Sequence, residues 1–328
     1  MQEQTIGTQV APLLMQPQRG ERCLADVVQG HSTRIHDRLL EVGALLFRGF
    51  KVQSLEDFDL FISAFTDLRM DYTYASTPRT PLGNRVFTAT EYPRDQEIPL
   101  HNESSYQREW PLKLALCCLR VATTGGETPI ARMRDVGTFI GRRLLDKFEE
   151  LGVTYLRHYR PFVDLPWQKV FHTDDPKQVS EFCKSNDIEC EWLDSDTLRT
   201  RQTCQGTARH PITGSRIFFN QAHLFHISSL GPPAEKAIIN YFGKDRLPRQ
   251  TYYGNGQEIP TADLELVRDA FTRATVTFSW RPGDILLLDN MQYAHGRRPF
   301  VGERQVLAAL MEPYSEKGIS RVRNDKAS

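Results

Sequence analysis

The strand pattern at the two ends of the chain is the feature that most restricts its fold. After the turn Pro282-Gly283, the apolar run 284–288 predicts a buried strand, and residues 304–311 predict another. Residues 43–47 and 86–90 predict strands in the first part of the chain. Short strands with Gly/Pro turns, and no regular alternation of strand and helix, favour an antiparallel barrel. We therefore expect a mainly β fold with helical additions and a double-stranded β-helix (jelly-roll) core.

Helical spacing of apolar residues predicts the additions. Residues 32–42 have this spacing, and Ser54 is a good N-cap for a second helix that begins after it. Further helices are expected over 135–151, near 235–242 and near 262–271. These helices lie between the predicted strands, so we expect them to cover the barrel.

The predicted elements also suggest a domain plan. The Gln-rich segment 1–20 is expected to be flexible, and residues 21–328 are expected to form one domain. Within that domain, the mixed segment at about 160–260 is rich in charged residues, aromatic residues and turns. We interpret it as an insertion over the barrel that acts as a lid.

Composition excludes several classes of partner. The 328 residues include 41 basic and 41 acidic side chains. The chain therefore has no net positive charge that would attract nucleic acid or an anionic membrane. No run of apolar residues is long enough to span a bilayer, and the start of the chain does not resemble a signal peptide. We expect a cytoplasmic protein with a small-molecule substrate. The oligomeric state does not follow from the sequence.

The six cysteines form no C-x-x-C pair. Reduced structural thiols are the favoured interpretation, as in most cytoplasmic proteins. A disulfide between Cys183 and Cys190, or a zinc site, is the alternative.

A candidate metal site combines residues that lie far apart in the sequence. His101 and Glu103 would point to the same face of an extended strand, since side chains i and i+2 share a face. His295, which follows the buried strand 284–288, could complete a set of two imidazoles and one carboxylate. This set leaves part of an octahedral shell open, as in non-heme Fe(II) oxygenases.

Arg304 is a candidate for binding a carboxylate. It lies at the start of the final apolar strand, where its side chain could enter a barrel and hold the distal end of a dicarboxylate. Arg297 and Arg298 compete for this role, although their loop position favours exposure to solvent.

Polar residues near these motifs are candidates for substrate binding. Asn102 and Tyr106 flank the first metal motif, and Asn220 and His223 lie inside the apolar run 217–226. Buried polar groups need partners. We expect these four residues to hold the amino or carboxylate group of a substrate.

Several short motifs occur in a fixed order along the chain. They are GALLFRGF at 43–50, HNE with Ser105-Tyr106 and Trp110-Pro111 at 101–111, GGET at 125–128, Asn290-Met291 with HGR at 295–297, and GER at 302–304. Together they resemble the taurine-dioxygenase-like (TauD/TfdA) superfamily, whose members depend on Fe(II) and 2-oxoglutarate. Glu103, where aspartate is commoner, and the segment 210–226 are similar to the branch of clavaminate synthase and the syringomycin-pathway hydroxylases.

The resemblance implies a role for each matched residue. His101, Glu103 and His295 would bind iron, and Arg304 and Thr128 would bind the distal carboxylate of 2-oxoglutarate. Many relatives carry two basic residues where this chain has Arg304-Gln305, so Arg304 is the one candidate there. The glutamate also argues against a halogenase, in which a small residue typically occupies its position.

The implied activity is oxidation by dioxygen, with 2-oxoglutarate converted to succinate and carbon dioxide. We expect hydroxylation of an unactivated C–H bond of an amino acid, free or tethered to a carrier protein, in natural product biosynthesis. Desaturation or cyclisation would use the same residues. A zinc hydrolase and a non-catalytic cupin-like binding protein are the alternatives from other classes. The first lacks an evident H-E-x-x-H general base, and the second would leave the complete ligand set without a role.

Overall fold

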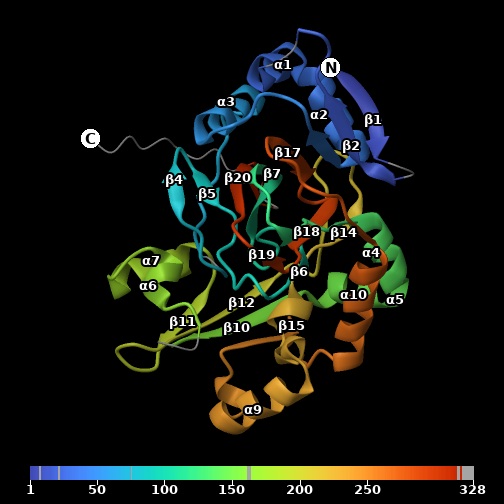
Figure 1. The fold of residues 1–328 in the computed structure, drawn as a ribbon. Helices are drawn as coiled ribbons and strands as arrows, with labels where there is room; N and C mark the ends of the chain where they lie inside the picture. The colour runs from blue at the N-terminus through green and yellow to red at the C-terminus, as the bar shows by residue number, and fades with distance from the viewer. Residues whose placement is uncertain (7–8, 21–22, 75, 161–163, 316–317, 320–328) are drawn as a thin grey trace.

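The computed structural model describes residues 1–328 except 7–8, 21–22, 75, 161–163, 316–317 and 320–328. A large sheet runs through the molecule, helices from the first part of the chain lie on one side of it, and a further sheet lies on the opposite side (Figure 1). No helix in the described part is long and apolar enough to cross a membrane.

The large sheet has the strand order β1-β2-β3-β17-β7-β20-β5-β4, and β21 pairs with β20. Strand β2 pairs with β3 in parallel, and the other described pairs in this sheet are antiparallel. The strands are β1 (Gln2–Ile6), β2 (Gln9–Gln16), β3 (Ala44–Phe47), β4 (Pro81–Gly83), β5 (Val86–Thr88), β7 (Glu109–Arg120), β17 (Asp284–Asp289), β20 (Gln305–Ser315) and β21 (Gly318–Ile319).

A smaller sheet with the order β16-β9-β18-β6 packs against the large one. Its strands are β6 (Ile98–His101), β9 (Ile130–Arg132), β16 (Thr275–Val276) and β18 (Tyr293–Arg297). Alternate side chains of β3 point to opposite faces of the large sheet, and both faces are apolar because each packs against a different core. Ala44 and Leu46 belong to the core between the sheets, whereas Leu45 and Phe47 pack with the N-terminal helices.

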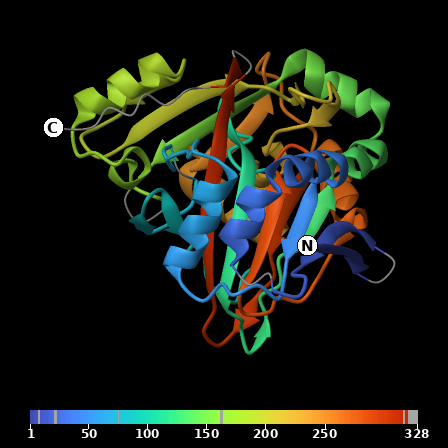
Figure 2. The ribbon, with the colours of Figure 1, turned by 90° about the horizontal axis from the view of Figure 1, so that it is seen from above.

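The N-terminal helices α1 (Leu24–Gly30), α2 (Ser32–Val42) and α3 (Leu55–Phe65) cover the outer face of the large sheet (Figure 2). Helix α3 begins where the sequence predicts. The Ser54 hydroxyl accepts the Asp57 N–H at 3.2 Å, and the Asp57 carboxylate accepts the Ser54 N–H at 3.1 Å, which together form a capping box.

A third sheet, of order β11-β12-β10-β15, contains much of the segment interpreted as an insertion. It shares a hydrophobic core with the helices around it, so this segment is folded structure, and its role as a lid stays a prediction. The sheet and the helices around it are α4 (Met133–Ile140), α5 (Arg142–Leu151), β10 (Val153–Tyr159), α6 (Trp167–Phe171), α7 (Pro176–Ser185), β11 (Glu189–Trp192), β12 (Leu198–Cys204), β15 (Arg249–Tyr253) and α10 (Thr261–Arg273), of which α4, α5, β10 and α10 lie outside the segment 160–260.

Short elements complete the described part of the chain. Strands β13 and β14 form one antiparallel pair, and β8 and β19, which lie far apart in the sequence, form another. These elements are β8 (Thr124–Gly125), β13 (Thr207–Arg209), β14 (Arg216–Phe218), α8 (Ala222–Phe225), η1 (Ile227–Leu230), α9 (Pro232–Phe242), η2 (Lys244–Arg246) and β19 (Phe300–Val301).

Two sequence predictions need correction. The N-terminus was expected to be flexible over 1–20, yet β1 and β2 belong to the large sheet, because apolar residues such as Leu13 and Met15 are buried there. The single helix expected over 135–151 is two helices, because Gly141 has a φ of 82° that ends α4. The six cysteines are free thiols, as the favoured interpretation expected.

Candidate metal centre

Two strands of the smaller sheet bring the two candidate histidines together. His101 is the last residue of β6, and His295 lies inside β18 directly opposite it. The two rings have a centroid distance of 4.6 Å. Backbone pairing between the strands therefore fixes the separation of the imidazoles.

Glu103 reaches the same point from a turn and not from a strand. Strand β6 ends at His101, and the turn that follows includes Ser104 with a φ of 57°. The Asn290 side chain replaces the missing strand partner, since its amide accepts the Glu103 N–H at 2.7 Å and donates to the Glu103 carbonyl at 3.0 Å. The expected shared strand face is thus wrong, although the two side chains do converge.

The donor atoms of these residues form one compact group. One ligand atom from each of His101, Glu103 and His295 lies within 4.8 Å of the others. His101 Nδ1 is 2.8 Å from the Pro99 carbonyl, which leaves Nε2 for a metal. His295 Nε2 lies 3.6 Å from Glu103 Oε2, which is too long for a hydrogen bond but suits two ligands of one ion.

The protonation state of the histidines also fits a metal. Burial lowers the pKa of His101 and of His295 below the usual value for histidine. Both imidazoles are therefore neutral near pH 7, as metal ligands must be. Two neutral nitrogens and one carboxylate, converging without hydrogen bonds to each other, are the donor set of a non-heme Fe(II) site.

A small cavity of about 30 Å³ adjoins this group. Its lining includes both histidines, Thr128 and three arginines, Arg79, Arg297 and Arg304. The candidate metal ligands and the candidate carboxylate-binding residues therefore share one space.

Arg304 and Thr128 are positioned by neighbouring groups. Arg304 Nε donates to the Gly126 carbonyl at 2.9 Å, and a Cβ at Gly126 would lie 3.0 Å from the arginine side chain. The Trp280 indole N–H donates to the Thr128 hydroxyl at 3.0 Å, which leaves the threonine O–H free to donate elsewhere. Burial lowers the pKa of Arg304 to about 10.

The two competing arginines have other partners. Arg297 donates to the backbone carbonyls of Tyr92, Pro93 and Gln96 at 2.6–3.0 Å. Arg298 pairs with the exposed Glu97 at 2.6 Å. These contacts hold the loop before β6 and leave Arg304 as the better candidate for a bound dicarboxylate.

Sequence reasoning missed Arg79. Its Nη2 lies 2.7 Å from Glu103 Oε2, and both side chains are buried. Burial acts to lower the pKa of Arg79, but the Glu103 carboxylate and the nearby Tyr72 and Tyr106 together raise it above its usual value. No motif marks this residue, because it lies in a loop rich in Thr, Pro and Gly whose path the sequence does not define.

The four predicted substrate contacts are all buried but have partners within the protein. The Asn102 amide N–H donates to the Asn290 carbonyl at 2.6 Å, and the Tyr106 hydroxyl donates to the Tyr74 carbonyl at 2.8 Å. The described lining of the cavity does not include these four side chains. Their contact with substrate stays a prediction.

The other two of these residues support the surrounding backbone. The Asn220 amide donates to the Gly206 carbonyl at 2.6 Å and accepts the Ala222 N–H at 3.0 Å. His223 Nε2 lies 3.1 Å from the Leu100 carbonyl, and burial lowers the pKa of His223 to about 3. A neutral His223 thus contacts the strand that ends at the candidate metal ligand His101.

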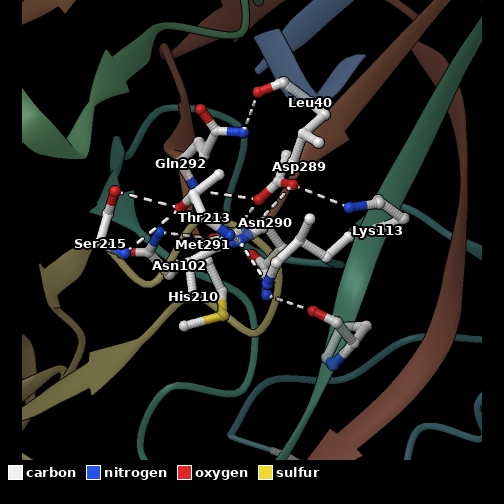
Figure 3. Close-up of polar contacts among 12 residues, drawn as sticks. Leu40, Asn102, Lys113, His210, Thr213, Ser215, Asp289, Asn290, Met291 and Gln292 are labelled. Carbon is white, nitrogen blue, oxygen red and sulfur yellow. Dashed lines mark hydrogen bonds and ion pairs between the residues drawn. The ribbon is translucent and has the colours of Figure 1, made fainter. Parts of the chain in front are cut away.

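A buried polar network surrounds Asp289 and Asn290 (Figure 3). The Asp289 carboxylate accepts from Lys113 Nζ at 2.8 Å and lies 3.0 Å from His210 Nε2. Although burial opposes it, the Lys113 ammonium holds the pKa of Asp289 well below its usual range. Because Asn290 follows Asp289 in the chain, this network anchors the residue that holds Glu103.

Comparison with known proteins identifies the family to which the chain is similar. The family model described as taurine catabolism dioxygenase TauD, TfdA family matches residues 18–311. The dapdiamide synthesis protein DdaC of Enterobacter agglomerans is 39% identical over 279 residues, covering 85% of each chain. A clavaminate synthase-like protein of Arabidopsis thaliana is 32% identical over 290 residues, covering 84% of this chain and 83% of that protein.

Solved structures agree on the fold. The PvcB protein from Pseudomonas aeruginosa superposes with a TM-score of 0.54 at 14% identity, covering 94% of this chain and 90% of that chain. The structure of AAD-2 in complex with Mn(II) and N-oxalylglycine has a TM-score of 0.52 at 13% identity, covering 91% and 92%. These likenesses confirm the predicted class, mainly β with helical additions around a jelly-roll core.

Proposed function

The chain belongs to the TauD/TfdA family of dioxygenases, and from this premise we propose that it hydroxylates an unactivated C–H bond of an amino-acid-type substrate. As a member of this family it is a 2-oxoglutarate-dependent dioxygenase that uses Fe(II) and dioxygen. Membership decides against the zinc hydrolase and the non-catalytic binding protein. The identity of the substrate and the outcome of the oxidation are the parts that we propose beyond family membership.

One observation supports the site assignment best. The ligand atoms of His101, Glu103 and His295 converge within 4.8 Å beside a cavity that also contains Arg304 and Thr128. We assign the first three residues as the iron ligands. Arg304 supplies a directed cation for the distal carboxylate of 2-oxoglutarate, and the Thr128 hydroxyl supplies a second donor.

The overall reaction balances in atoms and electrons. Fe(II), when bound, supplies the oxidising chemistry with dioxygen. One oxygen atom enters the substrate as a hydroxyl group, and the other enters succinate as 2-oxoglutarate loses carbon dioxide. The protein fixes the ligands, holds the dicarboxylate and excludes bulk water from a mostly buried site.

The names of similar proteins support a role in specialised biosynthesis, which is the setting we propose for the amino-acid-type substrate. DdaC is named for the synthesis of dapdiamide, and another PvcB structure is described as an oxygenase from an isonitrile synthetic pathway. A carrier-protein-tethered substrate fits this proposal as well as a free one. Desaturation or cyclisation remains the alternative outcome, since the same residues would perform it.

Succinate formation tests the proposal. Purified protein with Fe(II), 2-oxoglutarate and dioxygen is incubated with amino acids and aminoacyl carrier proteins, and products are analysed by mass spectrometry. A gain of one oxygen identifies hydroxylation, whereas a loss of two hydrogens identifies desaturation or cyclisation. Omitting Fe(II) provides the control, and equal succinate formation without the metal would contradict the proposal.

A further inference from the structure

Arg79 is a buried cation to which the proposed function assigns no role. Its side chain is 3% exposed and lies 2.7 Å from Glu103 Oε2. On its other side the guanidinium lies 4.6 Å from the centre of the Tyr72 ring. The carboxylate and the ring stabilise the charge, and they also fix where the remaining N–H groups lie.

Those remaining donors lack acceptors within the described part of the chain. Arg79 Nε and Nη1 are both buried and form no hydrogen bond there. A guanidinium has five N–H donors, and burying them without partners costs free energy. Arg79 lines the same cavity as His101 and His295, so its side chain lies beside the space where a substrate would react.

The charges around the cavity favour an anion as the partner. The described residues lining the cavity include Arg79, Arg297 and Arg304 but no carboxylate, and Glu103 adds one negative charge next to Arg79. Bound Fe(II) and 2-oxoglutarate cancel each other's charge. A positive excess therefore remains in the loaded site, and an anionic substrate would neutralise part of it.

We propose that Arg79 binds a free carboxylate of the prime substrate, a step that rests on the proposed function. Nη2 carries two N–H groups, so the one that does not face Glu103 can form a fork with Nη1 or Nε and bind a carboxylate in two parallel hydrogen bonds. Apolar lining residues such as Ala89, Ile98 and Ala308 suit an aliphatic chain beside it. Because Arg79 contacts the carboxylate of Glu103, the substrate is held by an acidic end close to the metal.

This inference restricts the substrate class. An amino acid joined to a carrier protein through its carboxyl group is a thioester and has lost that charge. The substrate is therefore a free amino acid or peptide acid, or a tethered acyl group with a second carboxylate. A neutral tethered aminoacyl group would leave Arg79 without its partner.

Binding measurements test this role apart from turnover. Wild type, Arg79→Gln and Arg79→Lys are loaded with Zn(II) and N-oxalylglycine, and calorimetry follows the binding of L-amino acids and N-acetyl-L-amino acids. Each free acid is compared with its primary carboxamide. Arg85→Gln is the matched control, since Arg85 lies on the same segment and pairs with the exposed Asp71 at 3.0 Å.

We expect at least one free acid to bind wild type about tenfold or more tightly than its carboxamide, as for a charge-assisted contact. Arg79→Gln should reduce this preference to within about twofold, and Arg79→Lys should retain part of it, because lysine keeps the charge without the fork. Arg85→Gln should behave like wild type. Zn(II) affinity should not fall in Arg79→Gln, because removing a cation beside Glu103 favours a metal there.

Several results would overturn the proposal. One is a wild-type protein with no preference for acids, and another is an unchanged preference in folded Arg79→Gln. If that variant fails to fold, an unchanged preference in Arg79→Lys counts against the role. Succinate formation without any acid preference overturns this inference alone, whereas failure of wild type to bind N-oxalylglycine contradicts the proposed function itself.

Discussion

His101 and His295 face each other across the antiparallel pair of β6 and β18, with ring centroids 4.6 Å apart. Each histidine belongs to a strand whose partner carries the other, so ordinary sheet pairing positions two of the three proposed ligands. The third proposed ligand, Glu103, depends on a side chain, Asn290, for the position of its backbone. The histidines are positioned by backbone pairing and Glu103 by a side chain, so we expect a mutation of Asn290 to disturb Glu103 more than the histidines.

Removing any ligand should abolish turnover. His101→Ala, Glu103→Ala and His295→Ala each leave two protein ligands, which hold Fe(II) poorly in a site with open positions. Wild type should bind one Fe(II) per chain, and each variant should lose both metal and succinate formation. His36→Ala is the control, because this half-buried histidine lies in α2 on the outer side of the large sheet. Near-normal activity in Glu103→Ala would mean that the ligand assignment is wrong.

Loss of the Asn290 amide should weaken metal binding without removing a ligand. Asn290→Ala leaves the Glu103 N–H and carbonyl without their partner, so the carboxylate is less well placed. We expect Fe(II) affinity to fall by about 10–100-fold, the usual range for outer-shell contacts. Asn255→Ala, in an exposed turn, is the control. Reduced thermal stability with unchanged metal affinity would limit Asn290 to a structural role.

The Asp289 network should contribute stability that depends on pH. Asp289→Asn leaves the Lys113 ammonium buried without its counter-charge, which should cost about 3–5 kcal/mol of unfolding free energy at pH 7. The folded pKa of Asp289 lies below its unfolded value of about 3.9. The contribution is therefore complete above that value and is lost as the pH falls toward the folded pKa.

Denaturant unfolding at pH 7 and pH 3 measures this difference. The gap between wild type and Asp289→Asn should shrink at the lower pH. Asp187→Asn is the control, because its pair with Arg108 is exposed and should contribute no more than about 1 kcal/mol. A gap that is equal at both pH values would show that the carboxylate charge does not stabilise the fold.

The sequence was sufficient to select three candidate ligands that the structure brings together, whose role as iron ligands stays a prediction, but it was insufficient for other side chains around them. Ser54 and the apolar run 284–288 have local signals, a cap and a buried strand, and both predictions are confirmed. The positions of Glu103 and Arg79 have no local signal, because each depends on a contact across the fold. Contacts between residues far apart in the sequence fix the positions of Glu103 and Arg79. The spacing of residues along the chain does not predict such contacts.

Trp280 should increase the affinity for 2-oxoglutarate through its hydrogen bond to Thr128. Trp280→Phe keeps most of the ring but removes the N–H that donates to the Thr128 hydroxyl. We expect the dissociation constant for 2-oxoglutarate to rise by about 3–10-fold, since one neutral hydrogen bond contributes about 0.5–1.5 kcal/mol. Thr128→Val, alone and combined with Trp280→Phe, completes a double-mutant cycle in which the dissociation constant for 2-oxoglutarate is measured for each variant. Fully additive effects would show that the two residues act independently.

Arg304 should decide the affinity for 2-oxoglutarate. The co-substrate has a second carboxylate remote from the metal, and burying it without a partner would cost several kcal/mol. Arg304 is fixed by its bond to the Gly126 carbonyl, and no ion pair joins it to a carboxylate in the described part of the chain. Its charge is therefore available to a ligand.

Arg304→Lys keeps the charge but loses the fork, so 2-oxoglutarate binding should weaken by about 1–3 kcal/mol. Arg304→Gln loses both and should weaken it further. An anaerobic titration of 2-oxoglutarate against the Fe(II) protein measures each change, and Arg298→Gln is the control because that residue pairs with Glu97 at the surface. Unchanged affinity in both Arg304 variants would transfer the role to Arg297, whose guanidinium lines the same cavity.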